Sequence, residues 1–150
     1  MIAEISREIV GREIEAAHML VAFHDGFAIE SDVYPELFVL AKSTRRDAIF
    51  RLRFDVSNYD EEPPQVRVVD ADGNEVASSK FPLLNNGAFP NHNLAGLPHF
   101  LCLQGVRDYY THENHLPSKT GLGWEQHRRL FPLSVVLKTI SDKFRNGDWH

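Results

Sequence analysis

Apolar residues recur at helical spacing over the start of the chain. The stripe consists of Ile2, Ile5, Ile9, Ala16, Leu20 and Phe23, and it is widened by Val10, Ile14, Ala17 and Val21. This pattern predicts an amphipathic helix. Gly11 lies inside the segment and costs about 1 kcal/mol relative to alanine, so the pattern also allows a break or kink there. Asp25-Gly26 indicates the end of the helix.

Short apolar segments, separated by polar turns, follow the helix. They are rich in Val, Ile, Leu and Phe and predict strands at Phe27–Glu30, Glu36–Lys42, Ala48–Asp55 and Gln65–Val69. Polar and apolar residues alternate most clearly from Arg51 to Phe54, as expected of a strand with one buried face. Asp70-Ala71-Asp72-Gly73 predicts a turn, because Asp-Gly readily adopts the positive φ that tight hairpins need.

The second half of the chain combines loops with a final helix. Asn, Gly, Pro and His dominate residues 85–96, which predicts an irregular loop, and another loop is expected over residues 111–123. A short apolar segment, residues 99–103, lies between the two. A helix is predicted to begin near Pro132 and to end at Gly147, and its apolar stripe is Leu133, Val136, Leu137, Ile140 and Phe144.

The order of these elements predicts the fold class. A helix, about four strands in a meander, an irregular segment and a second helix favour an α+β fold. We expect an N-terminal helix, a four-stranded antiparallel sheet, an irregular active-site segment and a C-terminal helix packed on the sheet. No linker or repeat divides the 150 residues, so residues 1–150 are expected to form one domain.

Composition and charge narrow the classes of function. The net charge of −5 argues against a nucleic-acid partner, because phosphate binding normally needs a basic face. One cysteine cannot form an internal disulfide, which suits a reducing compartment. The first twelve residues lack the apolar core of a signal peptide, and no apolar run approaches the roughly 20 residues that span a bilayer. We therefore expect a cytoplasmic protein with no membrane partner.

Three local motifs, in order along nearly the whole chain, resemble those of the ubiquitin-conjugating enzymes. Residues 58–66, Asn-Tyr-Asp-Glu-Glu-Pro-Pro-Gln-Val, resemble that family's Tyr-Pro-x-x-Pro-Pro-x-Val segment. Leu101-Cys102-Leu103 resembles its active-site Ile-Cys-Leu, and Phe89-Pro90-Asn91 upstream resembles its His-Pro-Asn. Trp124 and residues 132–140 resemble the tryptophan, proline and helix that follow the catalytic cysteine.

Several departures from the family pattern accompany the resemblance. Asp60 stands where the family usually has its first proline, and Phe89 stands in place of histidine. Asn91 lies eleven residues before Cys102, farther than the family's asparagine. The segment between Cys102 and Trp124 is longer than in eukaryotic members, and the family's last two helices have no counterpart. The chain is more similar to compact prokaryotic relatives, some of which accompany ubiquitin-like proteins and activating enzymes.

The resemblance implies a group-transfer activity centred on Cys102. The thiol would accept a ubiquitin-like protein from an adenylating, ThiF-like activating enzyme as a thioester. It would then transfer that protein to a nucleophile of a protein target, such as a lysine amine, with no cofactor. A thiol suits this role because its thiolate is strongly nucleophilic and also leaves readily. Composition alone would instead favour a buried structural cysteine.

Three further residues are candidates for the transfer step. Asn91 matches the family's carbonyl-stabilising asparagine by motif, and Asn93 matches it better by spacing; either could also be a turn-forming asparagine. His99, three residues before Cys102, could lower the thiol pKa or act as a base, although an ordinary strand-edge histidine fits it better. Asp108, His112 and Asp142 are candidates for deprotonating the incoming amine, and the sequence does not place them.

Three alternatives to a conjugating enzyme remain open. A non-catalytic adaptor of the same fold would bind a ubiquitin-like protein, and the altered His-Pro-Asn motif is compatible with it. A cysteine hydrolase would need a histidine and an orienting residue, and no familiar cysteine-protease signature surrounds Cys102. A metal-binding protein would use His112 and His115, with His127 as a third ligand, although exposed loop histidines explain all three more simply.

Overall fold

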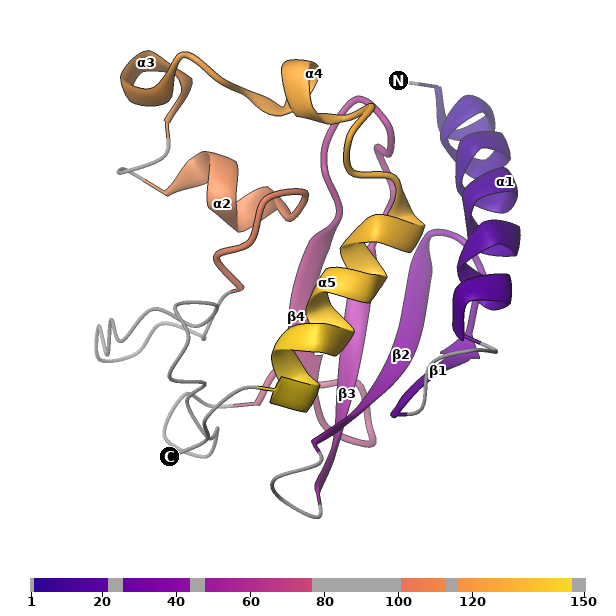
Figure 1. Cartoon of the computed structure of the whole chain (residues 1–150). Helices are drawn as coiled ribbons and strands as arrows, with labels where there is room; N and C mark the ends of the chain where they lie inside the picture. The colour runs from indigo at the N-terminus through magenta and orange to yellow at the C-terminus, as the bar shows by residue number, and fades with distance from the viewer. Residues whose placement is uncertain (1, 22–25, 44–47, 77–100, 113–115, 147–150) are drawn as a thin grey trace.

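The computed structural model describes residues 2–21, 26–43, 48–76, 101–112 and 116–146. Four strands form one sheet: β1 (Phe27–Ser31), β2 (Glu36–Ser43), β3 (Ala48–Asp55) and β4 (Gln65–Val69). The two long helices are α1 (Ala3–Val21) and α5 (Leu133–Asn146). Three short helices lie between β4 and α5: α2 (Arg107–Thr111), α3 (Pro117–Thr120) and α4 (Trp124–His127). Figure 1 shows this arrangement.

The sheet is an antiparallel meander in the order β1-β2-β3-β4. Val39 of β2 pairs with Leu52 of β3, which in turn pairs with Val68 of β4, so apolar side chains align on one face. Both Val39 and Leu52 are fully buried. Arg51 and Arg53 point to the opposite face, as strand alternation requires. One face of the sheet therefore carries the core.

Helix α5 covers that apolar face, with α1 beside it (Figure 1). Phe144 of α5 packs against Phe50 of β3, with ring centroids 5.5 Å apart. The whole predicted stripe of α5 is buried: Leu133, Val136, Leu137, Ile140 and Phe144. Helix α1 contacts α5 and β1 and continues without interruption through Gly11, so the break that the sequence allowed at that glycine does not occur.

The structure confirms the predicted α+β class, with an N-terminal helix, a four-stranded antiparallel sheet and a C-terminal helix on it. Each predicted strand is present within one residue of its expected bounds. The prediction of an irregular loop over residues 111–123 needs correction, because this segment contains the single-turn helix α3. Helices α2 and α4 were also not predicted, since elements of four or five residues are too short to show a periodic stripe.

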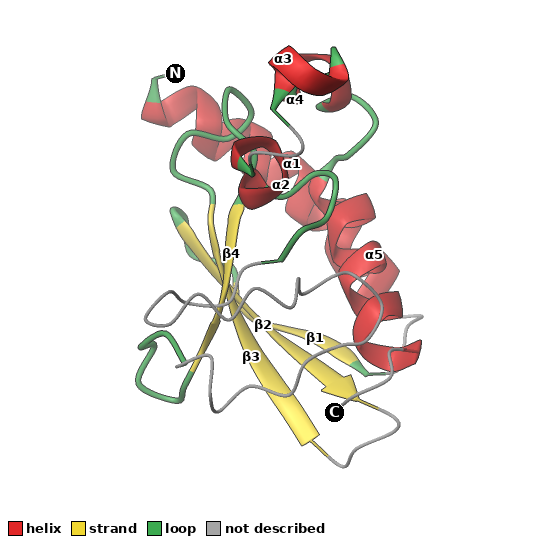
Figure 2. Cartoon of the chain, turned by 90° about the vertical axis from the view of Figure 1, so that its left-hand side faces the viewer, coloured by secondary structure: helices red, strands yellow, loops and turns green. Residues whose placement is uncertain are grey.

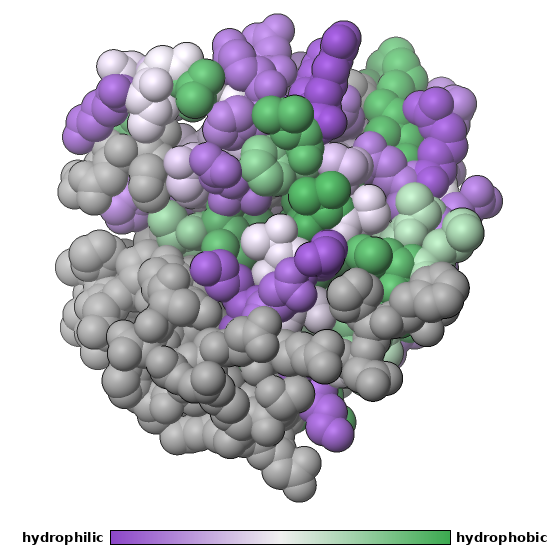
Figure 3. Space-filling model, viewed as in Figure 1, coloured by the Kyte–Doolittle hydropathy of each residue, from purple (hydrophilic) through white to green (hydrophobic). Residues whose placement is uncertain are grey.

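The surface seen in Figure 3 mixes polar and apolar residues, and apolar side chains gather near the centre of this face. Among the described residues, large exposed apolar side chains occur in the loops around α4 as well as on α1, including Leu122, Leu130 and Ile5. None of the described helices has the length and apolar character needed to cross a membrane.

Candidate active site

The irregular segment that leads into α2, residues 101–106, lies on the β4 side of the sheet (Figures 1 and 2). Cys102 is its second residue, five residues before Arg107, where α2 begins. Its neighbours Leu101 and Leu103 are only 1% and 9% exposed, whereas Cys102 itself is half-buried. Two buried leucines therefore hold the segment in the core from either side of the cysteine. The Arg107 amide donates to the Pro64 carbonyl at 2.9 Å, which ties the end of the segment to the start of β4.

The turn after Cys102 depends on Gly105. Its φ is +90°, a region that side chains rarely adopt. A Cβ atom at this position would lie 2.8 Å from Cγ2 of Val136 and 3.0 Å from Cβ of Phe131. The backbone therefore packs directly against α5 and the residues before it, and the position admits glycine alone without displacing its neighbours.

A buried polar pair lies next to this turn. The Gly105 amide donates to the Tyr110 hydroxyl at 3.0 Å, and that hydroxyl lies 3.0 Å from Nδ1 of His127. The Tyr110 ring also packs edge-on against Trp124, with centroids 5.8 Å apart. Burial is the main cause that raises the pKa of Tyr110 to about 12, so the phenol keeps its proton at neutral pH.

Asp108 is the acidic group that influences Cys102. Arg67 of β4 donates to both carboxylate oxygens of Asp108, and the Nη2–Oδ1 distance is 3.2 Å. Glu75 lies on the other side of the same guanidinium, with an Nε–Oε1 distance of 3.6 Å. Burial, and then the negative charge of Asp108, raise the pKa of the Cys102 thiol above its ordinary value. Cys102 is therefore largely protonated at neutral pH.

The segment after Cys102 is joined to the proline-containing turn before β4. Trp124 Nε1 donates to the Asp60 carbonyl at 2.8 Å, and the Trp124 and Tyr59 rings lie 6.2 Å apart. The Asp60 carboxylate is 3.8 Å from Arg128. Burial raises the pKa of Asp60, and the Arg128 charge acts in the opposite direction. These contacts connect residues more than 60 positions apart in the chain.

The candidate site residues fall into two groups. Asn91, Asn93 and His99 lie outside the described residues, so their predicted roles stay predictions. Of the three candidate proton acceptors, Asp108 lies where its charge acts on Cys102. His112 caps the C-terminal end of α2, and Asp142 is paired with Lys138 on α5 at 2.7 Å.

The histidines need one correction. His127, which the sequence grouped with exposed loop histidines, is only 7% exposed and contacts Tyr110 and Phe131. His115 lies outside the described residues. Within the described ranges, no group of three or more His, Cys, Asp or Glu side chains could hold a metal ion.

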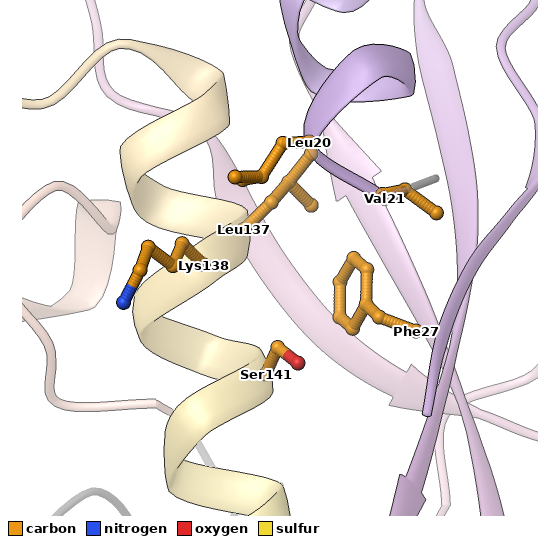
Figure 4. A pocket seen from close by; sticks show the side chains of 6 residues that line it. All are labelled: Leu20, Val21, Phe27, Leu137, Lys138 and Ser141. Carbon is orange, nitrogen blue, oxygen red and sulfur yellow. The ribbon is translucent and has the colours of Figure 1, made fainter. Parts of the chain in front are cut away.

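A small apolar hollow lies between α1, β1 and α5 (Figure 4). Its cavity volume is about 10 Å³, roughly the room that one water molecule needs. It is lined by Leu20, Val21, Phe27, Leu137, Lys138 and Ser141. The hollow is a packing defect between the helices, too small for an organic ligand.

Sequence reasoning missed Arg67 and Tyr110 as neighbours of the Cys102 segment. Arg67 is 41 residues from Asp108, and Tyr110 is 17 residues from His127. Single polar contacts over such separations leave no periodic signal in the sequence. Chemically, the arrangement combines a half-buried thiol with a nearby carboxylate that a guanidinium holds in place.

No model of a known protein family matches this chain, and no curated protein sequence shows significant similarity to it.

Proposed function

We propose that the protein is a conjugating enzyme that carries a ubiquitin-like protein as a thioester on Cys102. One observation carries the proposal: the thiol is half-buried between two buried leucines on an ordered irregular segment, within electrostatic reach of Asp108. Such a thiol is accessible at the surface while its backbone is fixed by the core. Transfer chemistry needs both properties.

The neighbourhood of the three motifs also supports this function. Residues 58–66, Cys102 and Trp124 carry the resemblance to ubiquitin-conjugating enzymes. The Trp124 indole donates to the Asp60 carbonyl, and the Arg107 amide, five residues after Cys102, donates to the Pro64 carbonyl. Segments that are distant in sequence and share one resemblance therefore lie against each other.

The first step is a transthioesterification. The Cys102 thiolate attacks the thioester carbonyl of the ubiquitin-like protein on the activating enzyme, a new C–S bond forms, and the activating-enzyme thiolate leaves. The raised pKa of Cys102 keeps the thiolate population small at neutral pH. The same raised pKa makes Cys102 a poorer leaving group, so the thioester persists until an acceptor amine arrives.

The second step is aminolysis of that thioester. A lysine amine attacks the carbonyl, the N–C bond forms, the C–S bond breaks, and Cys102 takes up a proton. The Asp108 carboxylate would attract the lysine ammonium and accept its proton. Arg67 holds that carboxylate through two hydrogen bonds, so its position is fixed before the acceptor binds.

A charging assay tests the proposal. The protein is mixed with a ubiquitin-like protein, its adenylating enzyme and ATP, and is analysed on a non-reducing gel. We expect a thiol-sensitive adduct that is absent in Cys102→Ala and becomes thiol-resistant in Cys102→Ser. Lys138→Ala, on the exposed side of α5, is the control and should charge normally. Absence of any adduct with the wild type, while the modifier still binds, would contradict the proposal.

One observation favours a second candidate, a non-catalytic adaptor of the same class. Cysteines whose pKa is raised by burial are usually unreactive, and Cys102 is such a cysteine. An adaptor would bind the ubiquitin-like protein with unchanged affinity in Cys102→Ala. The same gel, together with a binding measurement on Cys102→Ala, separates the two functions.

A further inference from the structure

The Tyr110 hydroxyl occupies the point where three elements meet. It accepts the Gly105 amide from the Cys102 segment at 3.0 Å and lies 3.0 Å from Nδ1 of His127 at the end of α4. Tyr110 belongs to α2 and is 7% exposed, as is His127. The pair is therefore buried inside the protein, and it reaches the Cys102 segment through the Gly105 amide, five residues before Tyr110.

The Tyr110 hydroxyl can make both of these hydrogen bonds at once. The phenol carries one proton and keeps it at neutral pH, because burial raises its pKa to about 12. The phenol oxygen accepts the Gly105 amide and still has a proton and a second lone pair with which to pair with Nδ1 of His127. The Tyr110 hydroxyl therefore links the Gly105 amide to Nδ1 of His127 through two successive hydrogen bonds.

The Gly105 peptide is a sensitive place for such a contact. Its left-handed φ and its close approach to Val136 and Phe131 leave a single conformation that fits. Cys102 is three residues upstream, between two leucines that pack into the core. A rotation of the Gly105 peptide would therefore shift the backbone that carries the thiol.

We propose that Tyr110 and His127 are positioning residues for Cys102: the Tyr110 hydroxyl holds the Gly105 amide, and His127 holds the hydroxyl, so the thiol is fixed relative to Asp108. This inference rests on the proposed conjugating function. Neither residue touches the modifier or the acceptor. Their effect falls on the transfer step, because a displacement of about 1 Å at a reacting group can slow a reaction about a hundredfold.

Four variants test the inference. Tyr110→Phe removes the hydroxyl and keeps the ring, and His127→Phe removes Nδ1 and keeps an aromatic ring. His127→Asn retains a polar group near the position of Nδ1 and is the conservative rescue. Tyr34→Phe is the matched control. Tyr34 lies on the turn between β1 and β2, and its hydroxyl donates to the Ser57 carbonyl at 2.6 Å, so this variant also removes one hydrogen-bonded hydroxyl.

Two readouts are measured on each full-length variant. The first is the discharge rate of the Cys102 thioester to free lysine, after charging. The second is the pH profile of Cys102 alkylation by iodoacetamide, which needs no activating enzyme and reports on one site because the chain has one cysteine. Thermal unfolding shows that each variant is folded at the assay temperature.

If Tyr110 and His127 position Cys102, the thioester should discharge about tenfold more slowly in Tyr110→Phe and in His127→Phe. This is less than the roughly hundredfold loss expected when a reacting group is displaced by about 1 Å. Their alkylation midpoints should move toward the ordinary thiol value, because a looser segment is better solvated. His127→Asn and Tyr34→Phe should behave as the wild type. Wild-type discharge and an unchanged profile in Tyr110→Phe would overturn the inference, as would equal changes in Tyr34→Phe.

The design separates this inference from the proposed function. If the wild type forms no thioester with any modifier tested, conjugation fails, and the alkylation profile alone decides on positioning. The Tyr110–His127 contact would then still be supported as the group that fixes Cys102 by three results together. The alkylation midpoint should shift in Tyr110→Phe, keep its wild-type value in His127→Asn and keep it also in Tyr34→Phe. An unshifted midpoint would overturn it.

Discussion

The Tyr59 hydroxyl donates a 2.7 Å hydrogen bond to Oε2 of Glu13, 46 residues earlier in the chain. The same carboxylate oxygen accepts the Leu133 amide at 2.8 Å. Leu133 opens α5, where backbone amides have no partner within their own helix. The Glu13 side chain of α1 therefore binds both the turn before β4 and the start of α5. The Trp124 ring packs against Tyr59 at the same place.

Glu13→Ala should destabilise the protein by about 2–3 kcal/mol, because it leaves a buried hydroxyl and a helix amide without their acceptor. Tyr59, the donor, is 1% exposed, so water replaces the lost contact poorly. Urea unfolding measures the effect. Glu15→Ala, on the exposed side of the same helix, is the control and should change stability by less than about 0.5 kcal/mol. Equal losses in the two variants would show that helix propensity, and not the shared acceptor, is responsible.

The Glu13 carboxyl also predicts a pH dependence. Burial is the main cause that raises its pKa above the ordinary 4.5, and Asp60 adds to the effect; the Leu133 amide, Tyr59 and Arg12 act in the opposite direction. A raised pKa means that the folded state holds the proton more tightly than the unfolded state. The contribution is therefore fully present below pH 4.5 and is lost as the pH rises through the folded pKa.

The comparison with Glu13→Gln isolates this contribution. The stability of the wild type relative to Glu13→Gln should be greatest near pH 4 and should decline toward neutral pH. Unfolding curves collected at several pH values give this difference directly. A difference that is constant with pH, or that grows as the pH rises, would mean that burial does not destabilise the ionised form of Glu13.

Asp108→Asn should lower the pKa of Cys102, because it removes the negative charge that, after burial, raises that pKa. We expect iodoacetamide to alkylate Cys102 about threefold faster at pH 7, because a larger fraction of the thiol is then ionised. Asp142→Asn, which breaks the Lys138 pair on α5, is the matched control and should leave the rate unchanged. A rate unchanged in Asp108→Asn would separate Asp108 from the thiol.

Two glycine-to-alanine substitutions should have opposite effects. At Gly105 the added methyl meets Val136 and Phe131 at a positive φ, and we expect a loss of about 2–4 kcal/mol from strain and overpacking. At Gly11, where nothing lies within 4 Å of the added Cβ, alanine should stabilise α1 by up to about 1 kcal/mol. Thermal and urea unfolding of both variants measure these changes. A neutral Gly105→Ala would contradict the close approach of that turn to α5.

The long helices and the strands could be predicted from the sequence, because each has a local periodic pattern of apolar residues. The stripe from Leu133 to Phe144 has helical period, and the alternation at residues 51–54 has the period of a strand. Both patterns reflect one physical demand, that an element places its apolar side chains on one face. The α+β class and the strand bounds follow from those patterns and the order of the elements.

The sequence could predict candidate residues of the site but not their contacts. The flanking motif predicts Cys102, and Asp108 was one of three candidate proton acceptors that the sequence could not place. The guanidinium that holds Asp108 and the Tyr110–His127 contact join separate elements and could not be predicted. His127 shows the difficulty, since a histidine in a polar stretch resembles an exposed one until its neighbours are known.

The two long helices and the four strands follow from the sequence alone, because short-range periodicity shows which side of each must be buried. The tertiary structure alone decided that Glu13 serves Tyr59 and Leu133, and that Gly105 rests on Tyr110. Single hydrogen bonds between distant residues have no period, and their partners become definite when packing brings the elements together.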